Sequence, residues 1–282
     1  MILVADSGST KTAWGLTTIP AQFHSEGLNP HFASDADIEA ACNAVKKWLQ
    51  GTGVAVGDIT ALCFYGAGCG DVAMRSHMES LLHRFMDIDN IVVETDLLGA
   101  CRALCGDSAG IVGIIGTGSN ACYYDGCSPV YCPVSTGYVL GDHGSGNHIG
   151  RRLLHDYLSG RMPKDISCLF HEMYGYSNTE FMARVYHQPN ASRFLASLAP
   201  FAVQMEGTPY GSSVIDECLD DWYRFQLQLV AEKTSCRALS VVGGLAVSVE
   251  NHLMRLAQKH GLELTKVLGS PLEELLKYHR IR

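Results

Sequence analysis

Two short stretches rich in Gly, Ser and Thr could hold a chain of phosphate groups. The first is Asp6-Ser-Gly-Ser-Thr-Lys-Thr12, and the second is Gly116-Thr-Gly-Ser-Asn120. In such turns glycine permits a tight backbone, and the N–H groups can converge on an anion. Lys11 adds a positive point charge to the first stretch. For either stretch taken alone, an ordinary hairpin loop made of turn-forming residues is the alternative.

Two aspartates follow predicted strands and could take part in the same chemistry. Asp6 ends the apolar run that opens the chain, and a carboxylate there could hold Mg²⁺ through water. Asp96 follows the short strand predicted over 91–93 and precedes a predicted helix. It could cap that helix, or it could be a general base that takes a proton from an attacking hydroxyl.

Two familiar phosphate-binding motifs are excluded by local pattern. The sequence contains no Gly-Lys dipeptide, so a Walker A loop is absent. Gly116–Ala121 matches the spacing G-x-G-x-x-A, but a dinucleotide site needs a helix next. Here the β-rich residues 121–124 follow, and a turn at Asp125-Gly126 ends them. Two hairpin turns that clamp one phosphate chain from both sides fit this pattern better.

Two further glycine-rich segments lie close to predicted helix starts. Gly141-Asp-His-Gly-Ser-Gly146 leads into a helix, with Asp142 as its carboxylate, and could simply be a capping loop. Gly243-Gly244 ends a predicted strand and precedes a helix. Such a pair could let the backbone approach a flat ring, or it could be a tight turn.

The elements that must position these residues form a repeated pattern. Each half of the chain opens with a strand, a Gly/Ser/Thr turn and a second strand, and helices and further strands follow. This alternation predicts an α/β protein with two like-built domains that contain mixed sheets flanked by helices and face each other across a ligand cleft. We place the first domain at 1–107, joined by the C-terminal helix at about 270–282, and the second at 108–269. The second half is expected to be mostly helical, with helices at about 147–159, 179–187, 191–205, 211–236 and 246–260.

Composition narrows the class of partner. The 282 residues include 21 Lys and Arg against 29 Asp and Glu, a net charge of −8, which argues against general nucleic-acid binding. No apolar run is long enough to cross a membrane. The 11 cysteines are scattered and form no CxxC pair, so we expect reduced thiols, a cytoplasmic location and no zinc site.

Four motifs occur together in order: the two turns at 6–12 and 116–120, Glu94-Thr-Asp96, and Gly141-Asp-His-Gly-Ser145. This set resembles the BadF/BadG/BcrA/BcrD-type ATPase family, and within it the N-acetylglucosamine kinase-like branch of the actin-like sugar kinase superfamily. The resemblance covers essentially the whole chain. It implies two actin-like (ribonuclease H-like) domains that bind ATP and Mg²⁺. It also implies transfer of the γ-phosphate to an N-acetylated amino sugar, N-acetylglucosamine or N-acetylmuramate, at the 6-hydroxyl.

The resemblance also implies roles for individual residues. Asp6 would help to hold Mg²⁺, and Asp96 would be the catalytic base beside the sugar. Contacts to the nucleotide would come from the two turns and the glycine pair: Ser7, Gly8, Ser9, Thr10, Lys11, Thr12, Gly116, Thr117, Gly118, Ser119, Asn120, Gly243 and Gly244. Further sugar contacts would come from Asn29, Gly68, Ser135, Thr136, Gly137 and Asp142.

Two positions depart from the family pattern. His143 stands where eukaryotic kinases of this type have Glu, which removes a carboxylate near the sugar. Thr136 stands where the substrate loop has an aromatic residue. The smaller side chain leaves room for a bulkier sugar, such as N-acetylmuramate with its lactyl ether.

Two other functions compete with the kinase. One is an ATPase that activates a 2-hydroxyacyl-CoA dehydratase or benzoyl-CoA reductase type system through a dimer-bridging iron–sulfur cluster; the scattered cysteines match no motif for it. The other is a non-catalytic nucleotide or sugar sensor, against which the pair Asp6 and Asp96 argues. For the kinase we expect a small-molecule amino sugar as the partner, no nucleic acid and no membrane, with a homodimer allowed by analogy.

Overall fold

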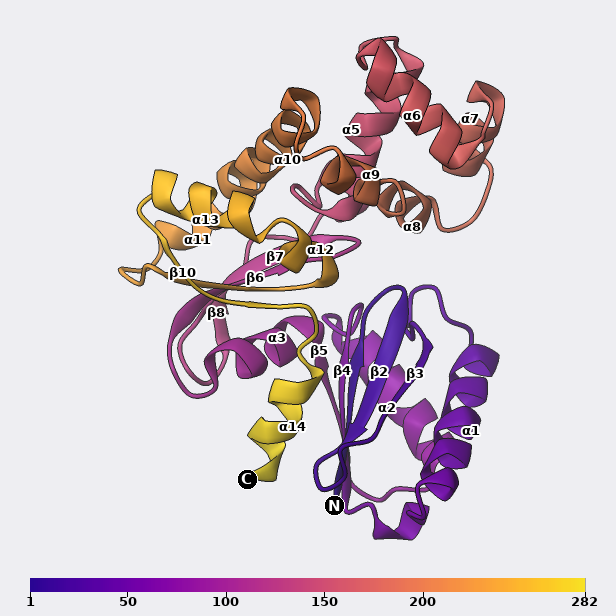
Figure 1. Cartoon of the computed structure of the whole chain (residues 1–282). Coiled ribbons are helices and arrows are strands. Elements are labelled where there is room, and N and C mark those ends of the chain that lie inside the picture. The colour runs from indigo at the N-terminus through magenta and orange to yellow at the C-terminus, as the bar shows by residue number, and fades with distance from the viewer. Residues whose placement is uncertain (282) are drawn as a thin grey trace. The chain divides into compact units, whose positions relative to one another are not determined.

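The computed structural model describes residues 1–281, and the chain divides into two compact units. The first unit contains residues 1–108 and 126–129 and the segment that begins at Ser270. The second contains Ala109–Asp125 and Val130–Gly269. Each unit is built on its own five-stranded sheet, as Figure 1 shows.

The sheet of the first unit is mixed, as predicted, with the order β3-β2-β1-β4-β5. Its strands are β1 (Ile2–Ser7), β2 (Lys11–Leu16), β3 (Gln22–Glu26), β4 (Ala61–Gly66) and β5 (Ile91–Thr95). The hairpin pairs β1–β2 and β2–β3 are antiparallel, whereas β1–β4 and β4–β5 are parallel. The carboxyl ends of β1, β4 and β5 therefore lie at one edge of this sheet.

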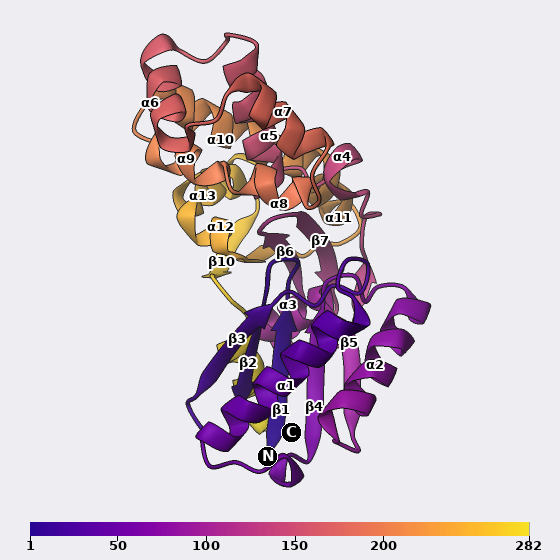
Figure 2. The same cartoon turned by 90° about the vertical axis from the view of Figure 1, so that its right-hand side faces the viewer.

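Helices cover both faces of this sheet (Figures 1 and 2). On one face, α1 (Asp35–Gly51) and α2 (Val72–Met86) pack on a core that includes Leu3, Trp14 and Phe64. On the other face lie α3 (Asp96–Cys105) and α14 (Leu272–Arg280). A short 3₁₀ turn, Val56–Asp58, precedes β4.

A chain of side chains ties the C-terminal helix α14 to the first sheet. Arg102 Nη1 donates a hydrogen bond to Tyr65 Oη at 2.7 Å, and this hydroxyl lies 2.8 Å from His279 Nε2. The Tyr65 hydroxyl thus bridges the guanidinium of Arg102 and the ring of His279. Arg280 Nε donates to the carbonyl of Thr17 at 2.7 Å. The last helix is thus anchored by specific polar contacts as well as by apolar packing.

The sheet of the second unit repeats the same topology, with the order β10-β9-β6-β7-β8. Its strands are β6 (Gly110–Ile115), β7 (Ser119–Tyr124), β8 (Pro129–Tyr131), β9 (Ala238–Val242) and β10 (Glu263–Leu268). The pair β6–β7 is antiparallel, and β6–β9 and β9–β10 are parallel. The strand–turn–strand pattern that opens each half of the sequence is therefore the antiparallel hairpin of each sheet.

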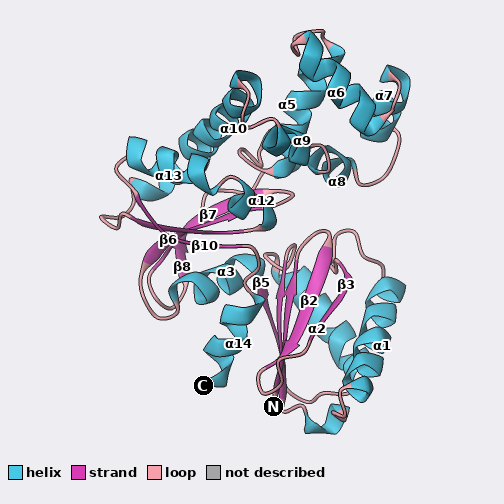
Figure 3. Cartoon of the chain, in the orientation of Figure 1, coloured by secondary structure: helices cyan, strands magenta, loops and turns pink. Residues whose placement is uncertain are grey.

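Most of the second unit is helical, as Figure 3 shows. One apolar cluster joins its helices to the sheet and contains the fully buried rings of Trp222, Phe170 and Phe181. The elements are α4 (Gly137–Leu140), α5 (Gly146–Leu158), α6 (Lys164–Tyr174), α7 (Asn178–Tyr186), α8 (Ala191–Ala196), α9 (Ala199–Gln204), α10 (Pro209–Trp222), a π-helical turn (Tyr223–Leu227), α11 (Gln228–Ala231), α12 (Gly244–Ser248) and α13 (Glu250–Lys259).

The second unit differs in detail from the sequence prediction. The helix expected over 191–205 is two helices, because Pro200 can begin α9 but cannot continue α8. Helix α6 was not predicted; its N-cap is Pro163, which provides no capping hydrogen bond and therefore no sequence signal. Strand β10 was also missed, because this edge strand carries no fully buried residue. Within residues 1–281, no helix combines the length and the apolar character needed to span a membrane.

Candidate active site

The first predicted turn joins β1 to β2 and packs against Gly27, which follows β3. The N–H of Gly8 donates to the carbonyl of Lys11 at 3.0 Å, and the N–H of Gly27 donates to the carbonyl of Thr10 at 3.2 Å. A methyl group on Gly27 would collide with the backbone of Gly8 and Ser9. Gly27, which the sequence analysis did not include, therefore lets the turn rest directly on the segment that follows β3.

The side chains of Ser7 and Thr12 lie inside the hairpin. Both residues are fully buried, and their hydroxyl oxygens are 2.8 Å apart. Thr12 donates to the carbonyl of Glu26 at 2.9 Å, and Ser7 accepts from the N–H of Leu28 at 3.0 Å. These two predicted nucleotide contacts thus stabilise the hairpin. The hydroxyl of Ser9 and the ammonium group of Lys11 lie on residues that are exposed within this unit.

Asp6 and Asp96 lie at the carboxyl-terminal edge of the first sheet. Asp6 is on β1, and Asp96 is the first residue of α3, directly after β5. The N-cap of α3 is Thr95, whose hydroxyl accepts from the N–H of Leu98 at 3.1 Å. The capping role considered for Asp96 therefore belongs to Thr95. One oxygen of Asp96 accepts from the N–H of Leu97 at 2.9 Å.

Both carboxylates are half-buried and electrostatically perturbed. Burial and, to a smaller extent, the nearby Asp96 carboxylate raise the pKa of Asp6 to about 7, although Lys11 opposes the shift. Burial also raises the pKa of Asp96 to about 6, although its hydrogen bond from Leu97 acts in the opposite direction. Two such groups at one sheet edge are typical of sites that bind a cation or move a proton.

Two predicted sugar contacts come together in the first unit. Asn29 is buried on the segment after β3, and its Oδ1 accepts from the N–H of His31 at 3.0 Å. Gly68, on the loop after β4, has φ of 84° and lies against this amide, so that a methyl group there would collide with Asn29 Oδ1. Only glycine satisfies both the backbone angle and the close approach.

The second predicted turn, at residues 116–120, directs two consecutive carbonyls to the start of α5. The carbonyls of Gly116 and Thr117 accept from the N–H groups of Gly146 (2.8 Å) and Asn147 (3.1 Å), which begin α5. A trans peptide directs its C=O and N–H in opposite directions. The N–H groups of Thr117 and Gly118 therefore point together away from α5, as a phosphate-binding turn requires.

The glycine pair lies beside this turn within the second unit. Gly243 has φ of 138°, and a methyl group on it would collide with the carbonyl of Ile115 at the end of β6. Its N–H donates to the carbonyl of Leu268 at 2.8 Å. Gly244 begins α12 and has open space around it. The structure thus brings the predicted adenosine contact next to the predicted phosphate turn.

The remaining predicted sugar contacts lie in the second unit, where Thr136 and Gly137 lie against Gly141, the residue before Asp142. Ser135, Thr136 and Gly137 are exposed on the segment that enters α4 in the second unit. Asp142 belongs to the same unit but lies against the second turn, where its Oδ2 accepts from Asn147 Nδ2 at 2.9 Å. The side chain of Asn120, predicted to contact the nucleotide, accepts from the N–H of Ala121 at 2.9 Å.

A group of residues near the second turn has the composition of a metal site. Ligand atoms of His143, His148 and Asp221 lie within 4.8 Å of one another. However, the N–H of Gly144 donates to His148 Nδ1 at 3.0 Å, so the neutral ring carries its proton on Nε2, the atom that faces Asp221 at 3.9 Å. Burial lowers the pKa of His148 to about 4, which keeps the ring neutral. This tautomer fits a histidine–carboxylate contact better than metal ligation.

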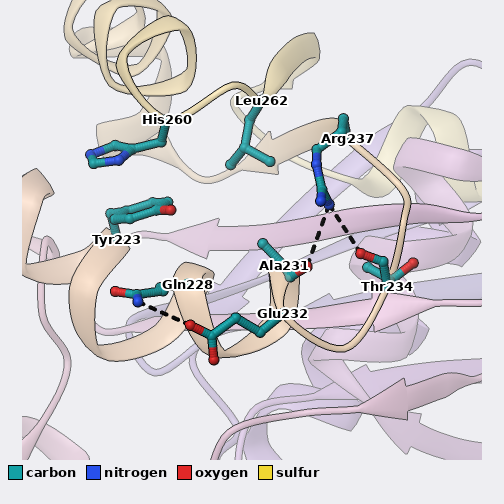
Figure 4. A pocket seen from close by; sticks show the side chains of 8 residues that line it. All are labelled: Tyr223, Gln228, Ala231, Glu232, Thr234, Arg237, His260 and Leu262. Atoms are coloured by element: carbon teal, nitrogen blue, oxygen red, sulfur yellow. Dashed lines mark hydrogen bonds between the residues drawn. The ribbon is translucent and has the colours of Figure 1, made fainter.

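The second unit also has a surface pocket that contains none of the predicted residues (Figure 4). The rings of Tyr223 and His260 stack there with centroids 3.5 Å apart. Arg237 directs its guanidinium to the carbonyl of Thr234 at 3.0 Å. Arg237 and Leu262 immediately precede β9 and β10, so the pocket lies at the amino-terminal ends of these strands. The glycine pair lies at the opposite end of β9.

Three solved structures show what kind of protein this chain resembles. No family model matches the chain, and no curated protein matches it. Among solved structures, a "putative N-acetylglucosamine kinase" from Porphyromonas gingivalis is 36% identical and has a TM-score of 0.92, with 100% of this chain and 99% of that chain covered. A second protein of that name, from Chromobacterium violaceum, is 18% identical, with a TM-score of 0.78 and 98% of each chain covered.

A more distant neighbour is a ROK-family glucokinase from Streptomyces griseus, solved with glucose and AMPPNP. It is 17% identical, with a TM-score of 0.59 and coverage of 99% of this chain and 98% of that chain. At these identities the second and third structures show the fold alone, an α/β fold of the actin-like sugar kinase type. The similarity to the P. gingivalis protein is close enough to show family. The chain belongs to the actin-like sugar kinases, in the same family as that protein.

Proposed function

We propose that the chain transfers the γ-phosphate of ATP to the 6-hydroxyl of an N-acetylated amino sugar, N-acetylglucosamine or N-acetylmuramate. The observation that carries this proposal is the pair of perturbed carboxylates, Asp6 and Asp96, beside the first turn. The P. gingivalis relative, whose name specifies N-acetylglucosamine, supports the substrate class. Within the superfamily we place the chain in the BadF/BadG/BcrA/BcrD-type group.

The nucleotide would be bound mainly by backbone groups. The N–H groups of Thr117 and Gly118 converge in one direction and suit a phosphate. Ser9 and Lys11 offer a hydroxyl and a charge from the first turn. The adenosine would lie along Gly243 and Gly244, where the backbone is bare of side chains. Binding of this kind orients the phosphates, and orientation is most of what phosphoryl transfer needs.

The two carboxylates fit a divalent cation. The Asp96 carboxylate helps to raise the pKa of Asp6, and a bound cation relieves such repulsion. Asp6, at the end of β1 and near Lys11, would hold it. When bound, Mg²⁺ neutralises phosphate charge.

Asp96 would act as the general base. Its pKa of about 6 leaves the carboxylate mostly ionised at neutral pH while keeping it basic enough to accept a proton. The sugar hydroxyl gives its proton to Asp96, its oxygen forms the bond to the γ-phosphorus, and ADP leaves. The hydrogen bond from Leu97 and the helix start at Thr95 fix the carboxylate in place. A positioned base contributes about 10²–10⁴-fold to the rate.

The sugar would contact Asn29 and Gly68, which lie together, and Thr136 would set the room around its substituents. The small, exposed Thr136 fits a lactyl ether, as in N-acetylmuramate. A Thr136→Trp variant should lose turnover of N-acetylmuramate more than turnover of N-acetylglucosamine. An unchanged ratio of the two rates would argue against this role.

The regiochemistry is tested by the product. Phosphorus-31 NMR of the product should show a phosphate monoester coupled to the protons on carbon 6. The 6-deoxy analogue of N-acetylglucosamine should inhibit but release no ADP above the sugar-free rate. Phosphorylation of that analogue would contradict the assignment. No observation favours the activator ATPase.

A further inference from the structure

The second turn and the loop before α5 are joined by a dense set of hydrogen bonds. Besides the two backbone bonds from Gly146 and Asn147 to the turn, the hydroxyl of Ser119 donates to the carbonyl of His143 at 2.7 Å. The N–H of Ser119 faces Asp142 Oδ1 at 3.4 Å. The turn is therefore fixed by residues 142–147, although more than twenty residues separate the two segments in the sequence.

The backbone conformation of Asp142 directs its side chain toward this turn. It is a non-glycine residue at a positive φ of 51°, a conformation that L-residues adopt uncommonly. Its carbonyl accepts from both the N–H (3.2 Å) and the hydroxyl (2.6 Å) of Ser145, the N-cap of α5. With its main chain held in this way, the carboxylate is directed at Gly118 and Ser119.

Gly118 leaves only enough room for that carboxylate. A methyl group on Gly118 would lie 2.9 Å from Asp142 Oδ2 and 3.1 Å from Oδ1. Gly118 has no positive φ, so its backbone angle does not require glycine. The close approach of Asp142 is therefore what excludes a side chain at this position of the turn.

Asn147 fixes the other side of the carboxylate. Its side chain is almost completely buried, and its Nδ2 donates to Asp142 Oδ2 at 2.9 Å and to Ser192 Oγ at 3.2 Å. Its Oδ1 has no hydrogen-bond partner within the described part of the chain. An unsatisfied buried acceptor is destabilising, so the stabilising contacts of this amide are those of its donor side, which holds Asp142.

We infer that Asp142 is a positioning residue for the second nucleotide turn. The family resemblance gives this residue only a sugar contact. The Asp142 carboxylate and the start of α5 together fix the conformation of the turn. In this conformation the carbonyls of the turn point toward α5, and the N–H groups of Thr117 and Gly118 point in the opposite direction. This role rests on the proposed function, in which that turn binds the phosphates of ATP. A turn already in its binding conformation loses less entropy when the nucleotide binds.

The inference predicts a defect in nucleotide binding in the absence of sugar. Binding of ADP with Mg²⁺ would be measured by calorimetry for the parent, for Asp142→Asn and for Asp165→Asn, an exposed aspartate of α6 in the same unit. Asp142→Asn should weaken ADP binding by about fivefold or more, as expected when a charge-assisted hydrogen bond that orders the turn is lost. Asp165→Asn should bind like the parent. Parental affinity in Asp142→Asn would overturn the inference, since a residue that contacts only sugar leaves the binary complex intact.

A double-mutant cycle tests the contact itself. Asp142→Gly removes the carboxylate and tolerates the positive φ, so it opens the space beside Gly118. Gly118→Ala should therefore weaken ADP binding several-fold in the parent but clearly less in Asp142→Gly. Equal effects in both backgrounds would overturn the inference. If the parent itself fails to bind ADP, the proposed function fails and this inference fails with it, whereas a failure confined to the variants affects the inference alone.

Discussion

Replacing Asp96 by Asn should inactivate the enzyme and, at neutral pH, stabilise the unliganded protein. The carboxylate is the proposed base, so its loss should lower kcat at saturating ATP and sugar by at least about 100-fold. ATP binding should be retained, because Asn has nearly the same size. The same substitution removes a charge that the fold holds in a half-buried position beside Asp6.

The size of the stabilisation follows from the pKa of Asp96. Burial raises it from an ordinary value of 3.8 to about 6, so the ionised form costs about 3 kcal/mol at pH 8, at about 1.4 kcal/mol per pH unit. The raised pKa means that the folded state holds the proton more tightly than the unfolded chain. The contribution of Asp96 to the stability of the parent therefore falls as pH rises from about 4 to about 6 and then stays low. Asn has no charge to lose this stability. The substitution also removes the charge beside Asp6, which raises the free energy of unfolding further.

The assay is urea unfolding of the full chain at pH 8 and pH 5, without ligands, with the transition of the first unit as the readout. Asp96→Asn should exceed the parent in free energy of unfolding by up to about 3 kcal/mol at pH 8, and the advantage should fall by about half at pH 5. Asp89→Asn, which neutralises an exposed carboxylate of the same unit, is the matched control and should change neither activity nor the pH dependence.

Two results would refute the reasoning separately. Near-parental turnover in Asp96→Asn would remove Asp96 from the chemistry. A stability difference between variant and parent that is the same at both pH values would show that the carboxylate is not strained by burial, whatever its role in catalysis.

Three further substitutions test other parts of the account. Gly243→Ala, which forces a methyl group against the backbone at the end of β6 from a positive φ, should destabilise the second unit by about 1–3 kcal/mol and weaken ADP binding. The neighbouring Gly244→Ala, with open space around it, should leave the stability unchanged; thermal unfolding measures both variants, and ADP titration measures the first. Gly68→Ala should raise the KM for sugar by about tenfold or more with little change in the KM for ATP. Equal increases in the two KM values would show that this loop does not contact the sugar. Tyr65→Phe should lower the free energy of unfolding by about 1–3 kcal/mol, because it leaves His279 and its partner guanidinium without the hydroxyl between them, and an unchanged urea midpoint would contradict that anchor for α14.

The fold could be predicted from local patterns to a considerable extent. The local sequence predicts the two hairpins, because each consists of an apolar strand, a Gly/Ser/Thr turn and a second strand within about fifteen residues. Strand β10 depends on pairing with β9, some twenty-five residues earlier, and its three polar and three apolar residues do not alternate regularly. Elements whose stability comes from distant partners are the ones that the sequence analysis missed.

Only part of the candidate site could be predicted, because only some of its residues follow local sequence patterns. Asp6 lies near the end of β1 and Asp96 directly follows β5, and these strands end at one sheet edge, so the closeness of the two residues could be inferred from topology. The residues that hold the turns could not be inferred. Gly27 supports a turn nearly twenty residues before it, and Asn147 holds Asp142 through a buried amide. Neither contact leaves a pattern in sequence, although the conspicuous glycine after β3 was a signal available for the first.

The most direct test of the central claim is Mg²⁺-dependent release of ADP from ATP with glucose, glucosamine, N-acetylglucosamine, N-acetylmannosamine or N-acetylmuramate, and with no sugar. The proposed function predicts release that depends on an N-acetylated sugar, with N-acetylglucosamine or N-acetylmuramate as the best substrate and a negligible sugar-free rate. Equal release with and without sugar, or no release with any of them, would contradict the assignment of this site to an amino sugar kinase.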